Sequence, residues 1–435
     1  MKHASRFVGL ALLYLVLTLA AACDVDAKQV LAGPLEFSFG APMPGHILVT
    51  EGMVYSSQAG FGFEAGTALK SVHGTGTESA QSHAVASDKP FFFSVAVPEG
   101  NYKVTVTLGN PLAASETTVL AELRRLMLQQ IHTDAGQFQT RSFIVNVRQA
   151  AISTGGRVRL KDREKATEAW NWDDRLTLEF IGVNPSISTL KIEKADVPVV
   201  FIMGDSTVCD QPSEPFNSWG QMLPRFFKPD VAIANHAESG ESIASSLGAG
   251  RFNKIWSQMK KGDYLFVQFG HNDMKSKAAN ALQSYTDNLA MVVDKAQSLG
   301  GIPVICTPVS RRTFGSDGKI SNSFDGYPEA VRSVARKKNV PLIDLQPMTA
   351  AFYEALGPEA AVQAFANASE HTHHGDYGSY EIAKCVLLGI QQNKLGIASN
   401  IVDDFTGFDP SHPDSISSFT LPKSSSRNAQ TPLGN

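Results

Sequence analysis

Residues 197–207 read VPVVFIMGDST, an apolar run that ends at Gly204 and passes into polar residues. A run of this length bounded by glycine is typical of a strand buried on both faces of a parallel sheet. Similar runs recur at residues 231–234, 264–269, 302–307 and 340–344, and helical patterns occupy residues 278–299, 329–338 and 378–391. This alternation predicts a parallel sheet covered by helices on both faces. We therefore expect an α/β domain over residues 196–402, with reactive groups at the carboxyl ends of its strands.

The preceding residues, 33–195, have the pattern of an all-β unit, in which short alternating segments are separated by Gly, Pro and Asn turns. Residues 91–97 (FFFSVAV) and 102–108 (YKVTVTL) flank a turn and predict a hairpin. Further strands are expected at residues 142–147, 157–160, 176–181 and 189–192. Together they predict a sandwich of antiparallel sheets. Residues 403–435 are rich in Ser, Pro and Asn and predict an extended C-terminal tail.

The first 22 residues indicate export. Lys2, His3 and Arg6 precede an uncharged run at residues 7–22, shorter than the ~20 apolar residues that span a bilayer. We expect a cleaved signal peptide over residues 1–22 and a periplasmic or extracellular protein. The residues leave open whether Cys23 is then lipidated, which would anchor the protein to a membrane, or whether a conventional cut releases it.

Composition and charge argue against a nucleic-acid-binding protein and against a small disulfide-stabilised protein. The 435 residues include 38 basic and 42 acidic side chains, a net charge of −4. The basic residues are spread along the chain and offer no surface that would neutralise a row of phosphates, so we expect no nucleic-acid partner. Four cysteines are too few for a disulfide framework, and none lies in a CxxC pair.

Polar clusters follow four expected elements of the α/β domain. GDST puts Ser206 on a strand-to-helix turn, where it is either a nucleophile or a helix cap. Gly240 and Asn272 follow the next two strands and offer amides suited to an oxyanion, although both residue types also form ordinary loops. Before the last helix, EHTHHGD supplies a histidine to take the proton of Ser206 and an acid to orient the imidazole.

Three close histidines in that last cluster also suggest a metal site. No cysteine lies nearby, and no second ligand pair has a recognisable spacing, so the pattern does not favour zinc. We expect neither a metal nor an organic cofactor.

Together, GDST, N-x-A-x-x-G at residues 235–240, GHND at residues 270–273 and the acid-x-x-His pattern resemble the SGNH or GDSL hydrolase superfamily. Residues 200–211, 218–224 and 371–385 resemble the rhamnogalacturonan acetylesterase group of carbohydrate esterases. Residues 97–109 (VPEGNYKVTVTLG) and 121–128 (AELRRLML) are similar to the accessory domain of its bacterial members. The resemblance implies a flavodoxin-like three-layer hydrolase domain behind a galactose-binding-like sandwich. It also implies a serine esterase that deacetylates pectin, with acetylated pectic polysaccharide or oligosaccharide as its partner.

Carried over by motif position, Ser206 is the nucleophile and His373 the general base, and the resemblance makes Glu370 the triad acid. The oxyanion hole comprises the Ser206 amide, Gly240 and Asn272. The family usually has Asp three residues before its histidine, so Asp376 remains an alternative acid.

Two further positions bear on substrate recognition. Family members often have Gly-Gly-Arg-Ser where this chain has Ser239, Gly240, Glu241 and Ser242, and the loss of that arginine would change substrate contacts. Arg311 and Arg312 follow the fourth strand and either bind the carboxylates of galacturonate or form an ordinary surface pair.

Two alternative functions remain at this point. One is an esterase or lipase of the same superfamily with a different acyl group or alcohol. The other is an inactive carbohydrate-binding surface protein, which the unusual Glu370 keeps open.

Overall fold

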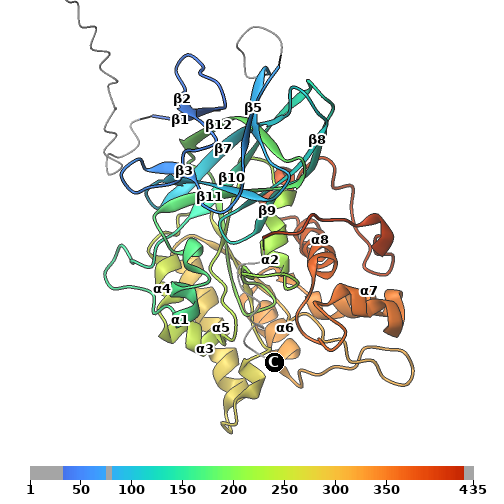
Figure 1. Cartoon of the computed structure of the whole chain (residues 1–435). Coiled ribbons are helices and arrows are strands. Elements are labelled where there is room, and N and C mark those ends of the chain that lie inside the picture. The colour runs from blue at the N-terminus through green and yellow to red at the C-terminus, as the bar shows by residue number, and fades with distance from the viewer. Residues whose placement is uncertain (1–32, 75–80, 426–435) are drawn as a thin grey trace, which may run out of the picture.

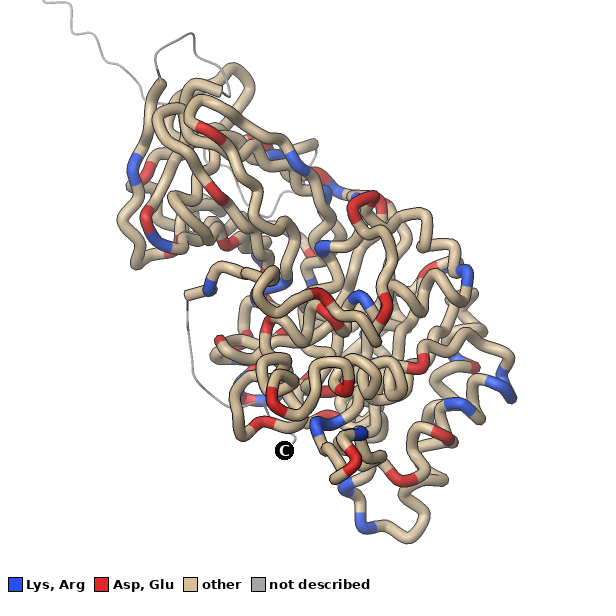
Figure 2. Tube along the Cα trace, turned by 90° about the vertical axis from the view of Figure 1, so that its right-hand side faces the viewer, with Lys and Arg blue, Asp and Glu red and all other residues tan. Residues whose placement is uncertain are grey.

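The computed structural model describes residues 33–74 and 81–425. The expected signal peptide and Cys23 lie outside these residues. The chain forms a β-sandwich stacked on an α/β unit (Figure 1), which confirms the predicted fold class. Basic and acidic residues are interspersed along the chain trace (Figure 2). Within the described residues, no helix combines the length and the apolar character needed to cross a membrane.

The sandwich consists of two sheets that enclose a phenylalanine-rich core. The first sheet contains β1 (Leu35–Phe39), β2 (Ile47–Val49), β4 (Lys70–His73), β5 (His83–Ala86), β7 (Gly100–Gly109), β10 (Phe138–Val147) and β12 (Ser186–Lys194). The second has the order β3-β6-β11-β8-β9, with β3 (Phe61–Phe63), β6 (Phe91–Ala96), β8 (Ser115–Ala121), β9 (Arg125–Thr133) and β11 (Arg175–Val183). All pairs in the second sheet are antiparallel.

The predicted hairpin at residues 91–108 is wrong. The two strands exist as β6 and β7, but β6 pairs with β3 and β11, whereas β7 pairs with β10 and β12 in the opposite sheet. The turn is therefore an arch over the sandwich edge, closed by a hydrogen bond from the Tyr102 hydroxyl to the carbonyl of Pro98. Alternation of apolar residues could not reveal this, because both strands direct apolar side chains into the same core.

The strand expected at residues 157–160 is also wrong. Only Arg157 makes a β-bridge, to Ala151. Residues 148–174 form a long connection between β10 and β11 that contains α1 (Asp162–Lys165) and η1 (Ala169–Asn171). The amide of Arg159 donates to the carbonyl of Ala249 in the α/β unit. This connection therefore leaves the sandwich and lies on its neighbour.

The α/β unit has a five-stranded parallel sheet of order β14-β13-β15-β16-β17, the flavodoxin-like arrangement. Its strands are β13 (Val199–Gly204), β14 (Ala232–Asn235), β15 (Tyr264–Gln268), β16 (Ile302–Cys306) and β17 (Leu342–Ile343). Its helices are α2 (Trp219–Met222), α3 (Ile243–Gly248), α4 (Arg251–Trp256), α5 (Ala281–Ser298), α6 (Tyr327–Lys338), α7 (Leu345–Ala360) and α8 (Asp376–Gln392). Short 3-10 turns are η2 (Leu223–Phe226), η3 (Asp273–Lys275), η4 (Ala361–Ala364), η5 (Gly396–Asn400) and η6 (Ile416–Ser418).

Both faces of this sheet are covered. Val200 and Ile202 of β13 pack in one apolar cluster with α2, α7 and α8, whereas Phe201 and Met203 pack in another with α4, α5 and α6. Leu120 and Leu126 of the sandwich belong to the first of these clusters. The apolar core is therefore continuous across the junction between the two domains, which favours one fixed arrangement of them.

The described part of the C-terminal segment, residues 403–425, returns from the α/β unit to the sandwich. Asp414 accepts from Lys384 of α8 at 2.7 Å, and further along the Ser424 hydroxyl donates to the Glu179 carboxylate of β11. This segment thus contacts both domains.

Candidate active site

Ser206 lies on the tight turn that follows β13. A Cβ at Gly204 would meet the Val208 side chain at 2.5 Å, so the turn requires glycine there. The Asp205 carboxylate accepts from the amide and hydroxyl of Thr207 and fixes the turn. Ser206 is only 1% exposed, more enclosed than a serine on a strand-end turn suggests.

His373 and Glu370 come to Ser206 from the loop before α8. The Ser206 hydroxyl lies 2.9 Å from Nε2 of His373, and Oε1 of Glu370 lies 3.2 Å from Nδ1 on the other side of the ring. The second contact is at ion-pair distance, but its angle departs from that of a hydrogen bond. Such bonds often tighten only when substrate binds.

Glu370 is held by its own loop. Its Oε1 also accepts the backbone N–H groups of residues 371, 372 and 373, each at 3.2 Å. Three amide donors on one oxygen fix the carboxylate beside the histidine, and the extra methylene of glutamate is accommodated by this local turn. The alternative acid, Asp376, instead accepts from Asn217 at 2.9 Å and from Lys423 at 3.0 Å.

The other two histidines of the cluster make separate contacts. His374 is buried, its Nε2 lies 2.6 Å from the Tyr353 hydroxyl, and burial lowers its pKa to about 3. Nδ1 of His371 lies 2.9 Å from the carbonyl of Arg312. The three imidazoles therefore do not converge on one point. The carboxylates that do converge in the described residues are Glu164, Glu168 and Glu238.

The expected oxyanion donors lie at neighbouring strand ends. Gly240 has a φ of 72°, a conformation that favours glycine. In the described part of the chain, the amides of Ser206 and Gly240 donate to no other group. One N–H of the Asn272 side chain donates to the carbonyl of Glu241 at 3.0 Å, which leaves the second for a ligand.

A buried hydrogen bond ties the Asn272 loop to the nucleophile turn. Nδ1 of His271 lies 3.2 Å from Asp205, and both side chains are almost fully buried. Burial raises the pKa of Asp205, but His271 and the bonds from Thr207 outweigh it, so the net pKa lies below the usual range. A charged carboxylate thus links the loops that carry Ser206 and Asn272.

The two arginines after β16 differ in their surroundings. Arg312 donates to the carbonyls of Ala368 and Glu370 at 2.8 and 2.9 Å and so braces the histidine loop. Arg311 lies nearer the reacting groups, and its bonds to Thr372, Ser323 and His271 are 3.4–3.5 Å long. The Arg311 guanidinium also lies 4.8 Å from the centre of the Phe324 ring, so this ring holds it together with the long bonds. The substrate-binding role of both arginines stays a prediction.

A cavity of about 240 Å³ adjoins Asn272. Polar side chains of Ser242, Asp273, Ser284 and Asn288 contribute to its wall. Burial raises the pKa of Asp273 to about 7, and its Oδ2 has no hydrogen-bond partner. The cavity also has apolar wall residues, among them Ile243 and Ala281, so its lining is mixed.

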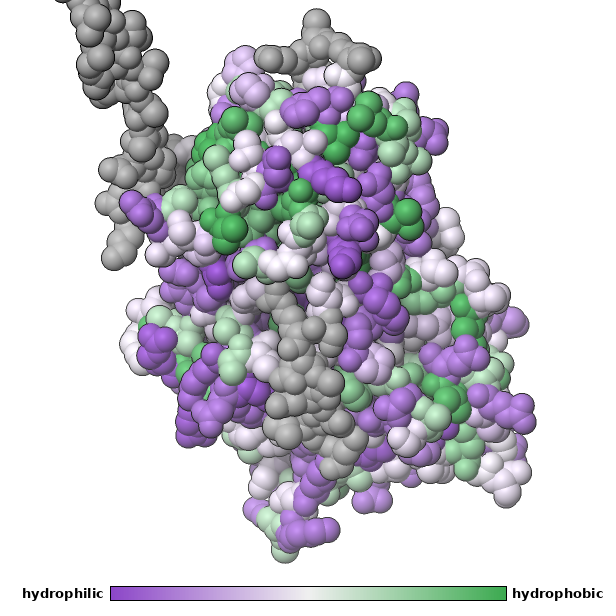
Figure 3. Space-filling model, in the orientation of Figure 1, coloured by the Kyte–Doolittle hydropathy of each residue, from purple (hydrophilic) through white to green (hydrophobic). Residues whose placement is uncertain are grey.

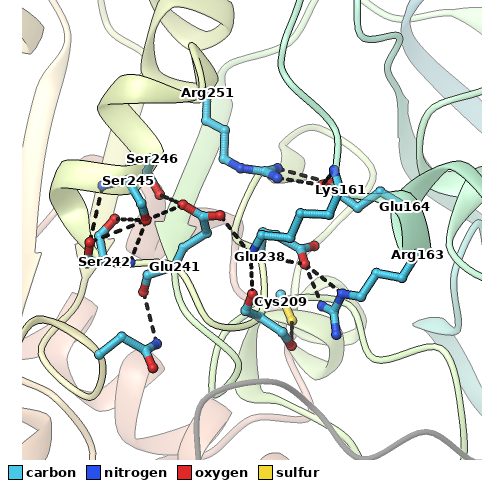
Figure 4. Close-up of polar contacts among 12 residues, drawn as sticks. Lys161, Arg163, Glu164, Cys209, Glu238, Glu241, Ser242, Ser245, Ser246 and Arg251 are labelled. Carbon is cyan, nitrogen blue, oxygen red and sulfur yellow. Dashed lines mark hydrogen bonds and ion pairs between the residues drawn. The ribbon is translucent and has the colours of Figure 1, made fainter. Parts of the chain in front are cut away.

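Glu241, expected to change substrate contacts, is instead buried and bound to protein groups. Its carboxylate lies 2.7 Å from Lys161 and accepts from the Ser245 hydroxyl (Figure 4). Burial would raise the pKa of Glu241, but Lys161 and Ser245 bring it below the usual range. Lys161 and Arg163 were missed from the sequence, because two cations in a connection carry no pattern that distinguishes them from surface residues.

Comparisons with known proteins agree with both domains. Residues 202–374 match the GDSL-like Lipase/Acylhydrolase family, and residues 35–153 match the beta-agarase/YXIM esterase-like, galactose-binding domain-like family. The chain is 36% identical to the rhamnogalacturonan acetylesterase RhgT of Bacillus subtilis (strain 168) over 217 residues, which cover 47% of this chain and 94% of RhgT.

Two comparisons extend over both domains. The uncharacterized esterase YxiM of Bacillus subtilis (strain 168) is 28% identical over 86% of this chain and 94% of its own length. A crystal structure of the YxiM protein from Bacillus subtilis superposes with a TM-score of 0.46 and 23% identity, over 83% of this chain and 99% of that chain.

Proposed function

Because the chain belongs to the GDSL-like lipase/acylhydrolase family, whose members are carboxylic ester hydrolases, we propose that it removes acetyl groups from plant cell-wall polysaccharide, with acetylated rhamnogalacturonan as the substrate. The observation that carries the proposal is the 2.9 Å contact between Ser206 and His373, backed by Glu370 and flanked by unbonded amides. The similarity to RhgT supports the pectic substrate.

The reaction begins with attack of the Ser206 hydroxyl on the acetyl carbonyl. Nε2 of His373 takes the hydroxyl proton as the C–O bond forms, and the Glu370 carboxylate stabilises the imidazolium. The carbonyl oxygen becomes negative at this stage. It is stabilised by the amides of Ser206 and Gly240 and by the second N–H of Asn272, all in place before the reaction starts.

Collapse of this intermediate expels the sugar. His373 returns its proton to the leaving sugar oxygen, and an acetyl group remains on Ser206. A water molecule then loses a proton to His373 and attacks the acetyl-enzyme, and the same donors hold the second oxyanion. Acetate leaves and Ser206 regains its proton, so every step uses groups of this chain.

The surroundings of Ser206 support a small acyl group on a polar alcohol. A serine that is 1% exposed admits an acetyl group more readily than a long chain. The cavity beside Asn272 includes hydroxyl and amide side chains that suit sugar hydroxyls, and the Arg311 guanidinium suits a galacturonate carboxylate. On the face visible in Figure 3, hydrophilic and hydrophobic residues are interspersed.

The proposed substrate also bears on location. Plant cell-wall polysaccharide is too large to enter a cell intact, so its esterase acts outside the cytoplasm. We therefore propose that residues 1–22 direct export, and that Cys23 determines whether the mature protein is anchored or released.

Acetate release tests the proposal. Purified protein is incubated with acetylated rhamnogalacturonan, with acetylated xylan and with a long-chain ester, beside the Ser206→Ala variant. We expect release from the pectic polymer by the wild type and none by the variant. We also expect Arg311→Met to raise KM for the pectic polymer, which carries carboxylates.

Three other results would each refute one part of the proposal: the substrate, the nucleophile or the enzymatic function. Release only from xylan or from the long-chain ester would refute the pectic substrate and keep the serine mechanism. Wild-type turnover by Ser206→Ala would refute the nucleophile. No release from any ester by a folded wild type would refute the enzymatic function.

A further inference from the structure

The loop that carries Gly240 is held by the other domain. We call residues 238–241 the oxyanion loop and residues 161–164, from the connection between β10 and β11, the clamp segment. Nζ of Lys161 donates to the carbonyl of Ser239 and lies 2.7 Å from the Glu241 carboxylate (Figure 4). Lys161 of the clamp segment therefore contacts Ser239 and Glu241, the two residues on either side of Gly240.

A second cation fixes the start of the same loop. Nε and Nη2 of Arg163 both donate to Oε1 of Glu238, the former at 3.0 Å. The amide of Glu238 donates to the carbonyl of Gly204 at 3.2 Å. The oxyanion loop is thus bound to the strand that carries the nucleophile on one side and to the clamp segment on the other.

The clamp segment also reaches Asn272 through Glu241. The Glu241 side chain contacts Lys161, while its carbonyl accepts from Asn272 at 3.0 Å. One residue therefore connects the clamp segment to the second expected oxyanion donor. A shift of Glu241 would move the Gly240 amide and the Asn272 side chain together.

The clamp segment is itself fixed. Glu164 receives two parallel hydrogen bonds from Arg251 of α4, at 3.0 and 2.6 Å, and both side chains are buried. The amide of Lys161 donates to the same carboxylate at 2.8 Å. Paired bonds of this kind between guanidinium and carboxylate define orientation as well as distance. These bonds fix the backbone of Lys161 beside the oxyanion loop.

The charge of Lys161 also matters, because it offsets the negative charge of a carboxylate beside Gly240. Glu238 and Glu241 are 4% and 3% exposed and lie on either side of Gly240. Two unpaired carboxylates there would oppose the negative oxygen that the Gly240 amide must stabilise. Lys161 neutralises Glu241, and Arg163 neutralises Glu238. The positive charge needed at the oxyanion loop therefore comes from the clamp segment.

We propose that Lys161 is a positioning residue for the oxyanion hole, and that the sandwich domain completes the esterase site through the clamp segment. The proposal rests on the assignment of Gly240 and Asn272 as oxyanion donors. Lys161 acts through Ser239 and Glu241 and touches no reacting atom.

Steady-state kinetics with 4-nitrophenyl acetate test this role in the full-length protein. Lys161→Met removes the ammonium and keeps the length of the side chain. We expect kcat to fall on the order of 10-fold, less than the ~10²–10³ lost with a donor itself, with KM changed by less than about 2-fold. Lys161→Arg should restore most of kcat, because it returns a cation to the same place.

The matched control is Lys165→Met in α1, the short helix that begins directly after Lys161. Lys165 is 60% exposed and pairs with Asp162 at 3.1 Å, so its loss should leave kcat and KM unchanged. Thermal unfolding of each variant confirms that it is folded at the assay temperature. Wild-type kcat in folded Lys161→Met, or no recovery in Lys161→Arg, would overturn the proposal.

A double variant separates charge from packing. Lys161→Met leaves the buried Glu241 unpaired, so adding Glu241→Gln should recover part of the lost kcat. If the double variant is slower than Lys161→Met, Lys161 does not act by neutralising Glu241 and the proposal fails. If Lys161→Met does not fold, the double variant, which has no unpaired carboxylate, is compared with the wild type. Its kcat should then be below that of the wild type because the bond to the Ser239 carbonyl is lost, and a wild-type kcat would overturn the proposal.

The pectic substrate is tested independently. If the wild type hydrolyses 4-nitrophenyl acetate but releases no acetate from acetylated rhamnogalacturonan, the proposed substrate is refuted and the role of Lys161 is unaffected. Normal turnover of 4-nitrophenyl acetate by Lys161→Met would refute the role of Lys161 and leave the proposed substrate intact.

Discussion

Replacing Glu370 by Gln tests the triad acid with little disturbance of its loop. Oε1 of Glu370 accepts three backbone N–H groups and faces Nδ1 of His373, all at 3.2 Å. A glutamine oxygen can keep these contacts, so the imidazole should stay in place and the main loss should be the negative charge. The variant therefore measures how much that charge stabilises the imidazolium.

The magnitude follows from the distance. Two unit charges 3.2 Å apart attract by about 5 kcal/mol at an effective dielectric constant of ~20. The carbonyl dipole of glutamine retains part of this attraction, so we expect a loss of about 3–4 kcal/mol, or about 10²–10³-fold in kcat/KM at ~1.4 kcal/mol per factor of ten. The melting temperature should change little, because the three amide bonds remain.

The assay is hydrolysis of 4-nitrophenyl acetate at fixed pH, with Asp376→Asn as the matched control. Asp376 is similarly buried and lies six residues away, but it pairs with Asn217 and Lys423. A folded Asp376→Asn should retain most of its activity. Wild-type kcat/KM in Glu370→Gln, or a larger loss in Asp376→Asn, would refute Glu370 as the acid that orients His373.

Two further predictions concern stability. Arg125 of β9 is fully buried and donates to Asp210 at 2.7 Å, so Arg125→Met should cost about 3–5 kcal/mol in denaturant unfolding by leaving that carboxylate unpaired; a loss under about 1 kcal/mol would contradict a buried interdomain ion pair. Burial, together with Glu238, raises the pKa of Glu168 to about 9. The folded protein therefore holds this proton more tightly than the unfolded chain, and the wild type should lose stability relative to Glu168→Gln as pH rises from about 5 to about 9. Melting temperatures of both proteins across that range check this, and parallel curves would contradict it.

The parallel sheet was predictable because its strands are buried on both faces. Val200 and Ile202 face one helical layer while Phe201 and Met203 face the other, so no polar residue interrupts the run. The reacting groups were predictable for a related reason. Carboxyl ends of parallel strands meet at one edge, so GDST and GHND had to approach each other wherever the helices lay. His373 was found through its spacing from Glu370.

The interdomain contacts were not predictable in this way. The arch between β6 and β7 depends on which sheet each strand joins, and the alternation of the two strands is the same for a hairpin. Lys161 contacts Ser239, 78 residues away, across a connection with no regular pattern. Glu241 was expected to change substrate contacts because it stands where family members often have arginine. Its burial against Lys161 depends on the folded structure and could not be inferred from that motif.

The proposed dependence on the sandwich concerns chains that contain both domains. The hydrolase half of this chain matches 94% of RhgT, so that relative has little sequence left for a second domain of comparable size. In this chain the carboxylates at the hydrolase loops pair with cations contributed by the sandwich, namely Arg124 with Glu214, Arg125 with Asp210, Lys161 with Glu241 and Arg163 with Glu238. Removing the sandwich would therefore leave four anions near Ser206 without these partners. If the clamp segment positions the oxyanion loop as proposed, these interdomain pairs make the two domains of this chain one catalytic unit.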